Sequence, residues 1–349
     1  MPQANKRLAQ GQSSENAPSV TRSITLKDVA RVAGLSPITV SRALNSPQLL
    51  RPATIARVRE AVELTGYIPN LLAGGLASKR SRLVAAIVPQ LFNAMFVETV
   101  QGLGDQLAAH GYQLLLSLSG YSPAHESELV SAILSRQPDG IVLTGINHAA
   151  ETRKRLLSAN VPVVETWDLT PTPIDMLVGF SHQKIGETIA RYLHGKGYRR
   201  FGLVWADDER AALRRAGLET VLNEYGIGKA ASHMVPTPAT LALGRKGLQV
   251  LLDSGSSFDA IVCSSDALAQ GVLTEAQVRG IKVPGQLAIM GFGDLDFAAH
   301  TVPSISSVHI DKRAIGIQAA NALLARIEGR PLKQRILDVG FELVERETT

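Results

Sequence analysis

Cysteine is nearly absent from this chain of 349 residues: Cys263 stands alone, which excludes an internal disulfide framework and a metal site built from clustered cysteines. Long apolar runs are missing too, since no uninterrupted stretch reaches the roughly 20 residues that a membrane-spanning helix needs. The first residues, MPQANKRLAQGQSSENAPS, contain two basic side chains but no apolar segment of the secretory type. We therefore expect a soluble, cytoplasmic protein with no membrane partner.

Signatures of common enzymes are also absent. The chain has no G-x-x-x-x-G-K-[ST] loop, no G-x-S-x-G elbow and no H-E-x-x-H motif. Gly102-Leu103-Gly104 resembles the start of a dinucleotide-binding loop, but it lies inside a helical stretch and does not follow a strand. The eight histidines are scattered without metal-ligand spacing. These absences predict no enzymatic activity, no cofactor and no metal.

The charges are distributed unevenly. Residues 1–82 contain 12 Lys and Arg against 4 Asp and Glu, a net charge of +8, whereas residues 83–349 contain 24 against 27, a net charge of −3. A small basic head on a slightly acidic body points to a polyanionic partner, with a solvated charged face as the alternative. Hydrophobic residues make up 45% of the chain, which is enough for large cores.

The body from Leu83 onward alternates strand-length apolar runs with amphipathic, helix-length segments. Such alternation is typical of mostly parallel sheets covered by helices on both faces. The runs are too numerous for one ordinary sheet, so we predict two doubly wound α/β lobes with a cleft between them. The predicted strands are 83–89, 112–118, 140–146, 161–167, 175–180, 200–206, 258–265 and 287–293, and the helices include 94–110, 124–136, 183–195, 210–225, 241–253 and 266–279.

The sequence of the head predicts a small all-α domain built around a helix-turn-helix. In the segment ITLKDVARVAGLSPITVSRALN, Gly34 suits the left-handed residue that ends a first helix. Ser36 is a good N-cap for a second helix, and Pro37 is well placed at its first position. A third helix is expected over about 53–65, with Ile55, Val58, Val62 and Leu64 on one face.

The second helix of the head carries side chains suited to DNA. Ser36, Thr39, Ser41 and Arg42 are short or forked hydrogen-bond donors near its N-terminal side. Arg42 has the geometry to bind a guanine bidentately, and the apolar Ile38 has the geometry to touch a thymine methyl. For any single Ser or Thr the alternative is an ordinary cap or surface hydroxyl.

The run Leu26 to Asn45 resembles the N-terminal signature of the lactose-repressor (LacI/GalR) family. Gly66-Tyr67-Ile68-Pro69-Asn70 and Leu76-Ala77-Ser78 resemble that family's exit from the third helix and its hinge helix, and the likeness covers about residues 24–347. Residues 1–22 are rich in Gln, Asn, Ser and Ala without periodicity, which predicts a disordered tail. The resemblance implies a DNA-binding domain at 23–69, a hinge at 70–82, and an effector-binding and dimerisation body of periplasmic-binding-protein type at 83–349. The body looks closest to the gluconate and ketogluconate branch of the family.

The resemblance also implies roles for individual residues. Operator bases are contacted by Pro37, Ile38 and Arg42, and the DNA backbone mainly by Thr25, Ser36, Thr39, Ser41, Asn45 and Tyr67, with Asn70 in the hinge. Leu76 matches a leucine that wedges into the minor groove, and an apolar wedge of this kind unstacks a base step and bends the duplex. Leu71, Leu72 and Leu76 packing against the body is the alternative.

The implied effector site lies between the lobes, at the ends of strands. Gly293 falls where many family members place an aspartate, and losing that carboxylate while keeping Arg214 favours an anionic ligand. We therefore expect a sugar acid such as gluconate or 2-ketogluconate, although Glu165 and Asp168 add negative charge nearby. The expected effector residues are Asn93, Phe96, Glu165, Trp167, Asp168, Arg214, Ser265 and Gly293.

The resulting hypothesis is a homodimeric transcriptional repressor that binds a palindromic double-stranded DNA operator under the control of this effector. Two alternatives remain open at this point: a sugar-acid enzyme, and a free-standing sugar-binding protein. Both predict that the chain ignores DNA.

Overall fold

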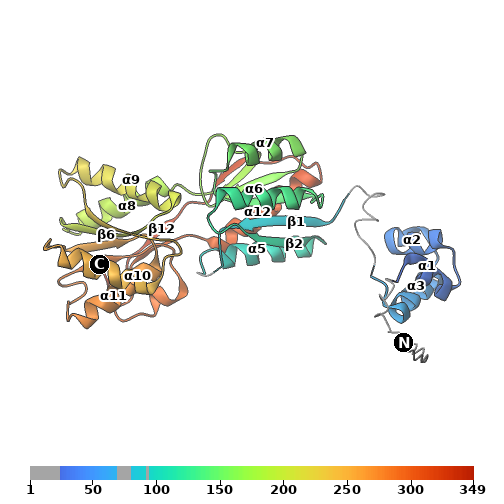
Figure 1. Cartoon of the computed structure of the whole chain (residues 1–349), viewed down its shortest axis with the longest axis horizontal. Coiled ribbons are helices and arrows are strands. Elements are labelled where there is room, and N and C mark those ends of the chain that lie inside the picture. Colours follow the sequence, from blue (N-terminus) through green and yellow to red (C-terminus); the bar gives the residue numbers. More distant parts are fainter. Residues whose placement is uncertain (1–23, 69–79, 92–93) are drawn as a thin grey trace, which may run out of the picture. The chain divides into compact units, whose positions relative to one another are not determined.

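The computed structural model of the protein describes residues 24–68, 80–91 and 94–349. These residues form two compact units, the head and the body, which divide between positions 79 and 80 (Figure 1). The hinge predicted at 70–82 therefore lies largely outside the described residues and stays a prediction. Among the described residues, no helix has the length and apolar character needed to cross a membrane.

Between residues 24 and 68, the head forms three α-helices and one short 3₁₀ turn. They are α1 (Leu26–Ala33), α2 (Pro37–Asn45), η1 (Pro47–Leu49) and α3 (Pro52–Thr65). Gly34 ends α1 in the left-handed region at φ 63°, and the hydroxyl of Ser36 accepts from the backbone N–H of Thr39 at 3.2 Å. Pro37 occupies the first turn of α2. The helix-turn-helix predicted from these three residues is confirmed.

A small apolar core holds the head together. Its buried residues come from all three helices: Val29, Ala30, Ala33, Val40, Ala43, Val58 and Ala61. Leu64, expected on the inner face of α3, is instead 72% exposed, because Ala61 and Val58 occupy the buried stripe. Arg57 donates from Nη2 to the carbonyl of Ala33 at 2.7 Å and so ties α3 to the end of α1.

The first lobe of the body is built on a six-stranded parallel sheet in the order β11-β5-β4-β3-β1-β2. Its strands are β1 (Leu83–Val88), β2 (Gln113–Leu118), β3 (Gly140–Thr144), β4 (Val163–Thr166), β5 (Met176–Gly179) and β11 (Ile336–Asp338). Ala85 and Ile87 pack with α6 (Pro123–Leu134) and α7 (Ala150–Ala159). Val84 and Ala86 face α5 (Val97–Ala109) and α12 (Lys312–Ile327) on the opposite side.

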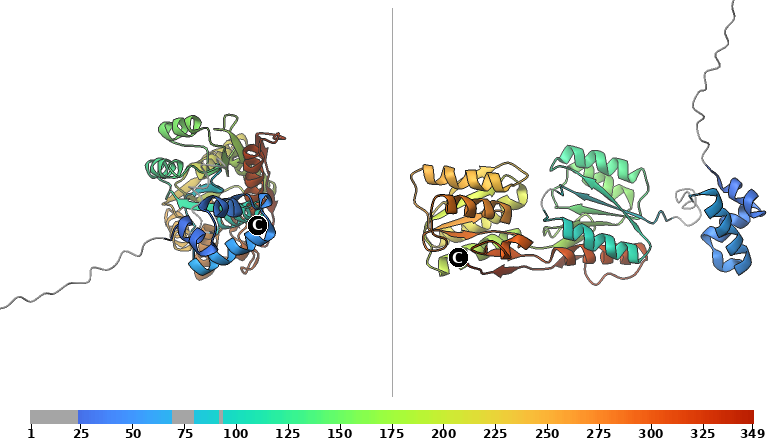
Figure 2. Two further views of the ribbon diagram at one scale, coloured as in Figure 1. Left: turned by 90° about the vertical axis from the view of Figure 1, so that its right-hand side faces the viewer. Right: turned by 90° about the horizontal axis from the view of Figure 1, so that it is seen from below.

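The second lobe repeats this plan with four parallel strands in the order β7-β6-β8-β9. They are β6 (Phe201–Ala206), β7 (Ala231–Val235), β8 (Ala260–Cys263) and β9 (Ala288–Met290). The helix pairs α8 (His182–Gly195) with α9 (Glu209–Glu224) and α10 (Leu241–Asp253) with α11 (Asp266–Val278) lie on opposite faces of the sheet (Figure 2). The 3₁₀ turn η2 (Asp296–Ala299) follows β9. The antiparallel ribbon of β10 (Ser307–His309) and β12 (Glu342–Val344) lies beside β9.

Three chain segments connect the two lobes. They run from β5 to α8, from β10 to α12, and from β11 to β12. The predicted two-lobed α/β body is thus confirmed. Elements that the apolar pattern did not single out include α7, α12 and β7, together with β10, β11 and β12, which are only three residues long.

Helices α8 and α9 approach each other unusually closely because each presents a glycine to the other's backbone. A Cβ at Gly186 would collide with the carbonyl oxygen of Arg214, and a Cβ at Gly217 would collide with that of Gln183. The N-terminal end of α8 and the Arg214 turn of α9 are therefore held together by backbone contact. This contact positions the site described below.

Replacing Gly186 by alanine should lower the free energy of unfolding of the body by about 3 kcal/mol, because backbone atoms cannot yield to the added methyl group. Gly195→Ala on the same helix is the matched control, since a Cβ there meets nothing within 4 Å. The control should be neutral or stabilising by up to about 1 kcal/mol. Urea unfolding followed by circular dichroism measures both, and equal midpoints for the two variants would contradict the packing argument.

Candidate functional site

Two adjoining pockets lie where the two lobes of the body face each other. The larger has a volume of about 220 Å³ and the smaller about 50 Å³. Residues that follow β2, β4, β6 and β8 line them, as expected for ligand sites at the carboxyl ends of parallel strands. Tyr121, Asp208 and Arg210 line both pockets, so the two spaces are neighbours that share a wall.

Arg214 lines the smaller pocket and is only 5% exposed. Its Nη2 donates to the carbonyl of Ser264 at 3.1 Å, its Nη1 lies 2.8 Å from Nδ1 of His182, and its guanidinium lies 3.9 Å from the ring centre of Phe292. Its Nε has no hydrogen-bond partner among the described residues. Burial lowers the pKa of Arg214 to about 10, well above neutral pH, so the pocket contains a buried cation.

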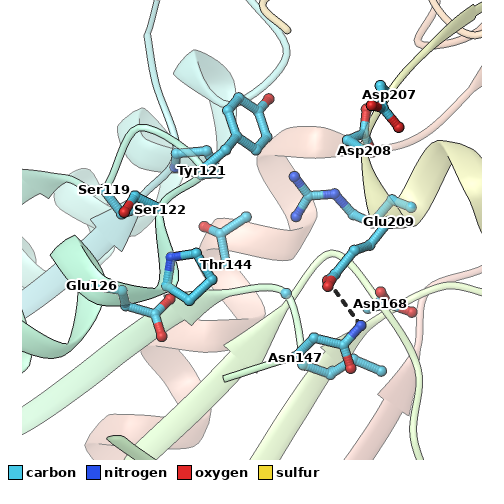
Figure 3. A pocket seen from close by; sticks show the side chains of 15 residues that line it. Ser119, Tyr121, Ser122, Glu126, Thr144, Asn147, Asp168, Asp207, Asp208 and Glu209 are labelled. Carbon is cyan, nitrogen blue, oxygen red and sulfur yellow. Dashed lines mark hydrogen bonds between the residues drawn. The ribbon is translucent and has the colours of Figure 1, made fainter. Parts of the chain in front are cut away.

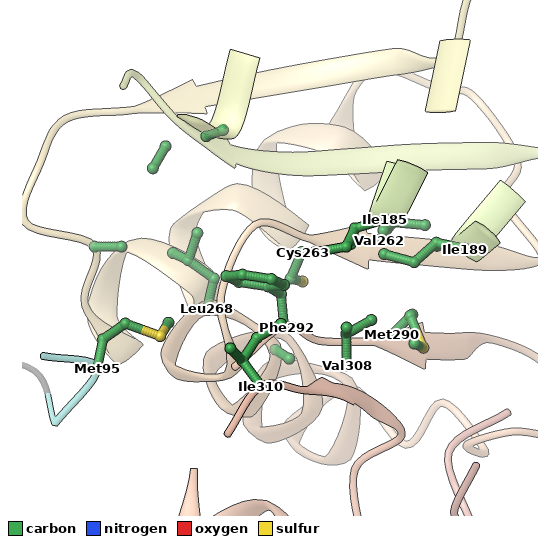
Figure 4. Packing of buried hydrophobic residues seen from close by; sticks show 14 of the residues in the cluster. Met95, Ile185, Ile189, Val262, Cys263, Leu268, Met290, Phe292, Val308 and Ile310 are labelled. Carbon is green, nitrogen blue, oxygen red and sulfur yellow. The ribbon is translucent and has the colours of Figure 1, made fainter. Parts of the chain in front are cut away.

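No carboxylate among the described residues forms an ion pair with Arg214. Asp208 and Asp168 act on it only through longer-range attraction, and Arg210 opposes them. The guanidinium lies over the ring of Phe292, which belongs to the apolar core around Leu268 and Ile310 (Figure 4). A buried guanidinium on an apolar floor has strong affinity for an anion that enters the pocket.

Two predicted aromatic residues also meet at the smaller pocket. Phe96 and Trp167 contact edge to face with ring centroids 5.0 Å apart. Trp167 is only 2% exposed, and its indole N–H donates to the hydroxyl of Thr99 at 3.2 Å. Because Trp167 is so deeply buried and makes edge-to-face contacts with Phe96 and Phe180, it forms part of the pocket wall and offers no open ring face on which a sugar could stack.

The turn that places Trp167 is strained. Trp167 adopts a φ of 71°, a region that non-glycine residues rarely occupy. Gly179 on the neighbouring strand permits the turn, since a Cβ there would collide with the backbone of Asp168. Strand β5 thus makes room for the Trp167–Asp168 turn at the pocket wall.

The larger pocket is predominantly acidic (Figure 3). Its charged residues are Glu126, Asp168, Asp207, Asp208, Glu209 and Arg210, and Ser119, Ser122, Thr144 and Asn147 add polar groups. Burial raises the pKa of Asp168 to about 6. Asn147 of the first lobe donates to Glu209 of the second at 2.9 Å, so the pocket wall joins the lobes. No group of three or more His, Cys, Asp or Glu among the described residues is arranged to hold a metal ion.

The placement of Glu165 contradicts its predicted effector contact. Its side chain is fully buried, lines neither pocket, and accepts from the backbone N–H of Ile174 at 2.5 Å. Its second oxygen lies 3.5 Å from His148, whose other nitrogen lies 2.8 Å from Glu126. Burial alone would lower the pKa of His148, but the two carboxylates outweigh it and raise that pKa to about 9. Glu165 is therefore part of a buried ion cluster in the first lobe.

The remaining predicted positions fall in different places. Ser265 lines the smaller pocket and caps α11. Gly293 lines neither pocket and has a φ of 118°, and a Cβ there would lie 2.7 Å from Cε of Met95. A direct ligand contact by Gly293 is therefore not supported, although it follows Phe292 of the pocket floor. Asn93 lies outside the described residues.

Several pocket residues escaped prediction. Tyr121 follows β2, and Asp208 and Arg210 follow β6. Ligand sites in parallel sheets lie at the carboxyl ends of the strands, so this rule would have predicted all three residues. Arg210 also lies over the ring of Phe96, with 5.4 Å from its guanidinium carbon to the ring centroid. His182 likewise follows β5, so the same rule would have placed it near the pocket. Its contact with Arg214 has no signal in the sequence, because it depends on how α8 and α9 pack.

In the head, α2 presents the side chains predicted to meet DNA. Pro37, Arg42 and Asn45 are exposed, and so is Ile38 at 66%. Such exposure is unusual for a branched apolar residue and suits a surface that binds a partner.

The other predicted DNA contacts form hydrogen bonds within the head. The hydroxyl of Thr25 donates to Asp28 at 2.7 Å, and the hydroxyls of Ser36 and Thr39 lie 2.9 Å apart. Asn45 donates to the carbonyl of Ser41 at 3.0 Å. Tyr67 packs partly against the head core. Asn70 and Leu76 lie outside the described residues.

Comparisons with known proteins agree with both parts of the chain. Residues 25–70 match the model for bacterial regulatory proteins of the lacI family, and residues 190–349 match the periplasmic binding protein-like domain. The HTH-type transcriptional regulator GntR of Pseudomonas aeruginosa is 38% identical over 327 residues, which cover 93% of this chain and 95% of the relative.

Solved structures show the same architecture. A LacI-family transcriptional regulator from Silicibacter pomeroyi matches with a TM-score of 0.88 and 31% identity, covering 93% of this chain and 99% of that one. The lac repressor dimer bound to operator and an anti-inducer matches with a TM-score of 0.82 and 23% identity, covering 94% and 99%.

The helix-turn-helix head and the pocketed two-lobed body together define a DNA-binding transcriptional regulator rather than an enzyme. The chain belongs to the LacI family of bacterial regulators, with GntR-type regulators among its relatives. The two alternatives of an enzyme and a free-standing sugar-binding protein are thereby set aside.

The burial of His182 beside Arg214 predicts how the free energy of unfolding depends on pH. Burial, and then the charges of Arg214 and Arg210, hold the pKa of His182 well below its usual 6.5. The folded protein therefore keeps His182 neutral, whereas the unfolded chain protonates it as the pH falls below about 6.5. Unfolding takes up a proton in this range, so this contribution destabilises the protein progressively toward acid.

Between pH 7 and pH 5, the wild-type protein should lose about 2 kcal/mol more unfolding free energy than His182→Gln, which has no proton to gain. Urea unfolding at several pH values provides the measurement. The exposed His300 supplies the control, because His300→Gln should follow the wild-type curve. Parallel curves for the wild type and His182→Gln would show that His182 is not held neutral.

Proposed function

We propose that this regulator is a homodimeric repressor of a palindromic operator, controlled by a sugar acid such as gluconate or 2-ketogluconate that binds between the lobes. Because its operator is chromosomal DNA, we expect the protein to act in the cytoplasm. The observation that carries the effector class is the buried guanidinium of Arg214, which lines the smaller pocket and has no carboxylate partner within the part of the chain that the structure describes. The resemblance to the gluconate branch of the family supports the same class.

The two pockets suggest how such a ligand lies. A volume of about 50 Å³ beside Arg214 suits a carboxylate but not a whole sugar acid. The adjoining space of about 220 Å³ offers carboxylates, hydroxyls and an amide, which accept from and donate to sugar hydroxyls. In this arrangement the acid group meets Arg214 and the hydroxylated chain extends past Arg210, while the acidic wall repels the reverse orientation.

The DNA interface proposed for the head centres on α2. Arg42, Ile38 and Pro37 contact base edges, while Thr25, Ser36, Thr39, Ser41, Asn45 and Tyr67 contact mainly phosphates and sugars. Asn70 and Leu76 complete the interface from the hinge. The hydrogen bonds that now engage the short polar side chains are local, so exchanging them for phosphate contacts requires only side-chain rotation.

Dimerisation pairs two heads on two half-sites of a palindrome. The lac repressor dimer bound to its operator, to which this chain is similar in fold, supports that assembly. An effector that contacts both lobes can alter DNA affinity only through a difference in its affinity for the two states of the body. If it favours the state with weaker DNA contact, it acts as an inducer; if it favours the tighter state, it acts as a corepressor.

Replacing Arg214 by methionine should weaken gluconate and 2-ketogluconate binding at least 100-fold, because the anion loses a buried cationic partner. Calorimetric titration of the purified protein measures this, with 6-phosphogluconate, ribose and glucose as comparison ligands. DNA binding should persist in Arg214→Met. Arg215→Met, one residue along α9 and paired with Glu219, is the matched control and should bind the acid normally. Wild-type binding to a neutral sugar alone would contradict a sugar-acid effector.

Replacing Arg42 by alanine should weaken binding to an operator selected from random DNA by about 1–3 kcal/mol and relax the preference at one base pair. Arg59→Ala removes an equal charge from the exposed surface of α3. Gel-shift competition between operator variants distinguishes the two changes. If Arg42→Ala weakens all sequences equally, as a phosphate contact would, Arg42 does not contact a base.

A further inference from the structure

The partners of His182 determine which of its nitrogens carries the proton. Its Nε2 lies 2.8 Å from the carbonyl of Trp167, which can only accept, so Nε2 must donate. Its Nδ1 lies 2.8 Å from Nη1 of Arg214, which can only donate, so Nδ1 must accept. These two partners fix His182 as a neutral imidazole with its proton on Nε2.

This arrangement holds a cation without cancelling its charge. The other groups on the guanidinium of Arg214 are the carbonyl of Ser264 and the ring face of Phe292, and both are uncharged as well. Two of the five N–H groups of an arginine are thereby used, so donor capacity remains. The cation is thus oriented by neutral neighbours alone among the described residues.

Another guanidinium of the same lobe has a charged partner instead of neutral ones. Arg245 on α10 binds Glu275 with Nε and Nη2 at 3.1 and 2.9 Å, and Arg279 binds the other oxygen of that carboxylate at 3.0 Å. In that cluster each guanidinium binds a carboxylate directly, so neither cation lacks an anionic partner. A glutamate in place of His182 would bring Arg214 close to this condition.

His182 also joins the two lobes at the ligand site. It begins α8, immediately after the segment that leaves β5 of the first lobe. Its Nε2–H binds the turn of Trp167 in the first lobe, and its Nδ1 binds Arg214 in the second. Arg214 is therefore positioned relative to both sides of the cleft by one small, uncharged ring.

We infer that His182 is the specificity-determining residue that makes this pocket select anions: as a neutral acceptor it positions Arg214 and leaves the guanidinium charge for the effector's acid group. This inference rests on the proposed sugar-acid function. It goes beyond that function in assigning the charge preference to His182, a residue that acts through Arg214 and need not touch the ligand.

The test compares gluconate with gluconamide, which has an uncharged amide in place of the carboxylate. Calorimetry on the full-length protein gives the ratio of the two affinities. We expect the wild type to prefer gluconate by at least about 50-fold, which corresponds to roughly 2.3 kcal/mol. His182→Gln offers a neutral acceptor and donor and should keep this preference within about threefold. His182→Glu should reduce the preference at least tenfold, mainly by weakening gluconate binding.

Retention of the full acid preference by His182→Glu would overturn the inference. So would an equal loss in His182→Gln and His182→Glu, because a neutral acceptor would then be insufficient. If the wild type shows no preference for gluconate over gluconamide, the proposed sugar-acid effector fails, and the inference that rests on it fails too. Failure of the proposed function is thus seen in the wild type, whereas failure of the inference alone is seen only in the His182 variants.

A measurement without ligand tests the tautomer of His182 on which the inference rests, and it also serves if His182→Glu does not fold. Nitrogen-15 NMR of histidine-labelled protein reports the tautomer of each ring, and His182→Gln assigns the signal. A neutral ring protonated on Nε2 at pH 6 supports the inference. A ring protonated on Nδ1, or an imidazolium at that pH, contradicts it.

Discussion

The buried guanidinium of Arg214 is the constraint around which the ligand pocket is organised. Removing such a charge from water costs several kcal/mol, and hydrogen bonds to an imidazole and a carbonyl recover only part of that cost. The fold keeps the charge in place through close packing of α8 on α9, which requires Gly186 and Gly217. An anion that enters the pocket would supply the missing partner, and the proposed preference for an acidic effector rests on this unbalanced charge.

The hydrogen bonds around the pocket continue toward the crossings between the lobes. The indole of Trp167 donates to Thr99, and Thr99 donates to the carbonyl of Lys312 at 2.8 Å. The ammonium of Lys312, which is 2% exposed at the start of α12, donates to the carbonyl of Gly293 at 2.9 Å. Gly293 follows Phe292, on whose ring Arg214 lies. A ligand at Arg214 thus touches a connected set of groups from both lobes, which is the physical setting that a closure-dependent regulator needs.

The sequence predicted the parts of this protein that depend on neighbours along the chain. Gly34, Ser36 and Pro37 specify a turn and a helix start within a few residues, and the structure shows both. In the body, Phe96, Trp167, Arg214 and Ser265 line the smaller pocket and Asp168 lines the larger one. Glu165 was misjudged because alternate residues of a strand point to opposite faces, and its face carries the buried cluster with His148. Leu64 was misplaced because the helical pattern near the end of α3 does not show where the core stops.

The sequence by itself determined the basic head and the alternating α/β body, because charge, periodicity and local caps are properties of adjacent residues, and its head motif resembles that of the LacI family. Only the tertiary structure decided the electrostatics of the pocket. His182 and Arg214 are 32 residues apart, and their contact depends on two glycines that let two helices meet. No local pattern reveals that the partner of a buried arginine is a neutral ring rather than a carboxylate, since that is settled by which side chains long-range packing brings together.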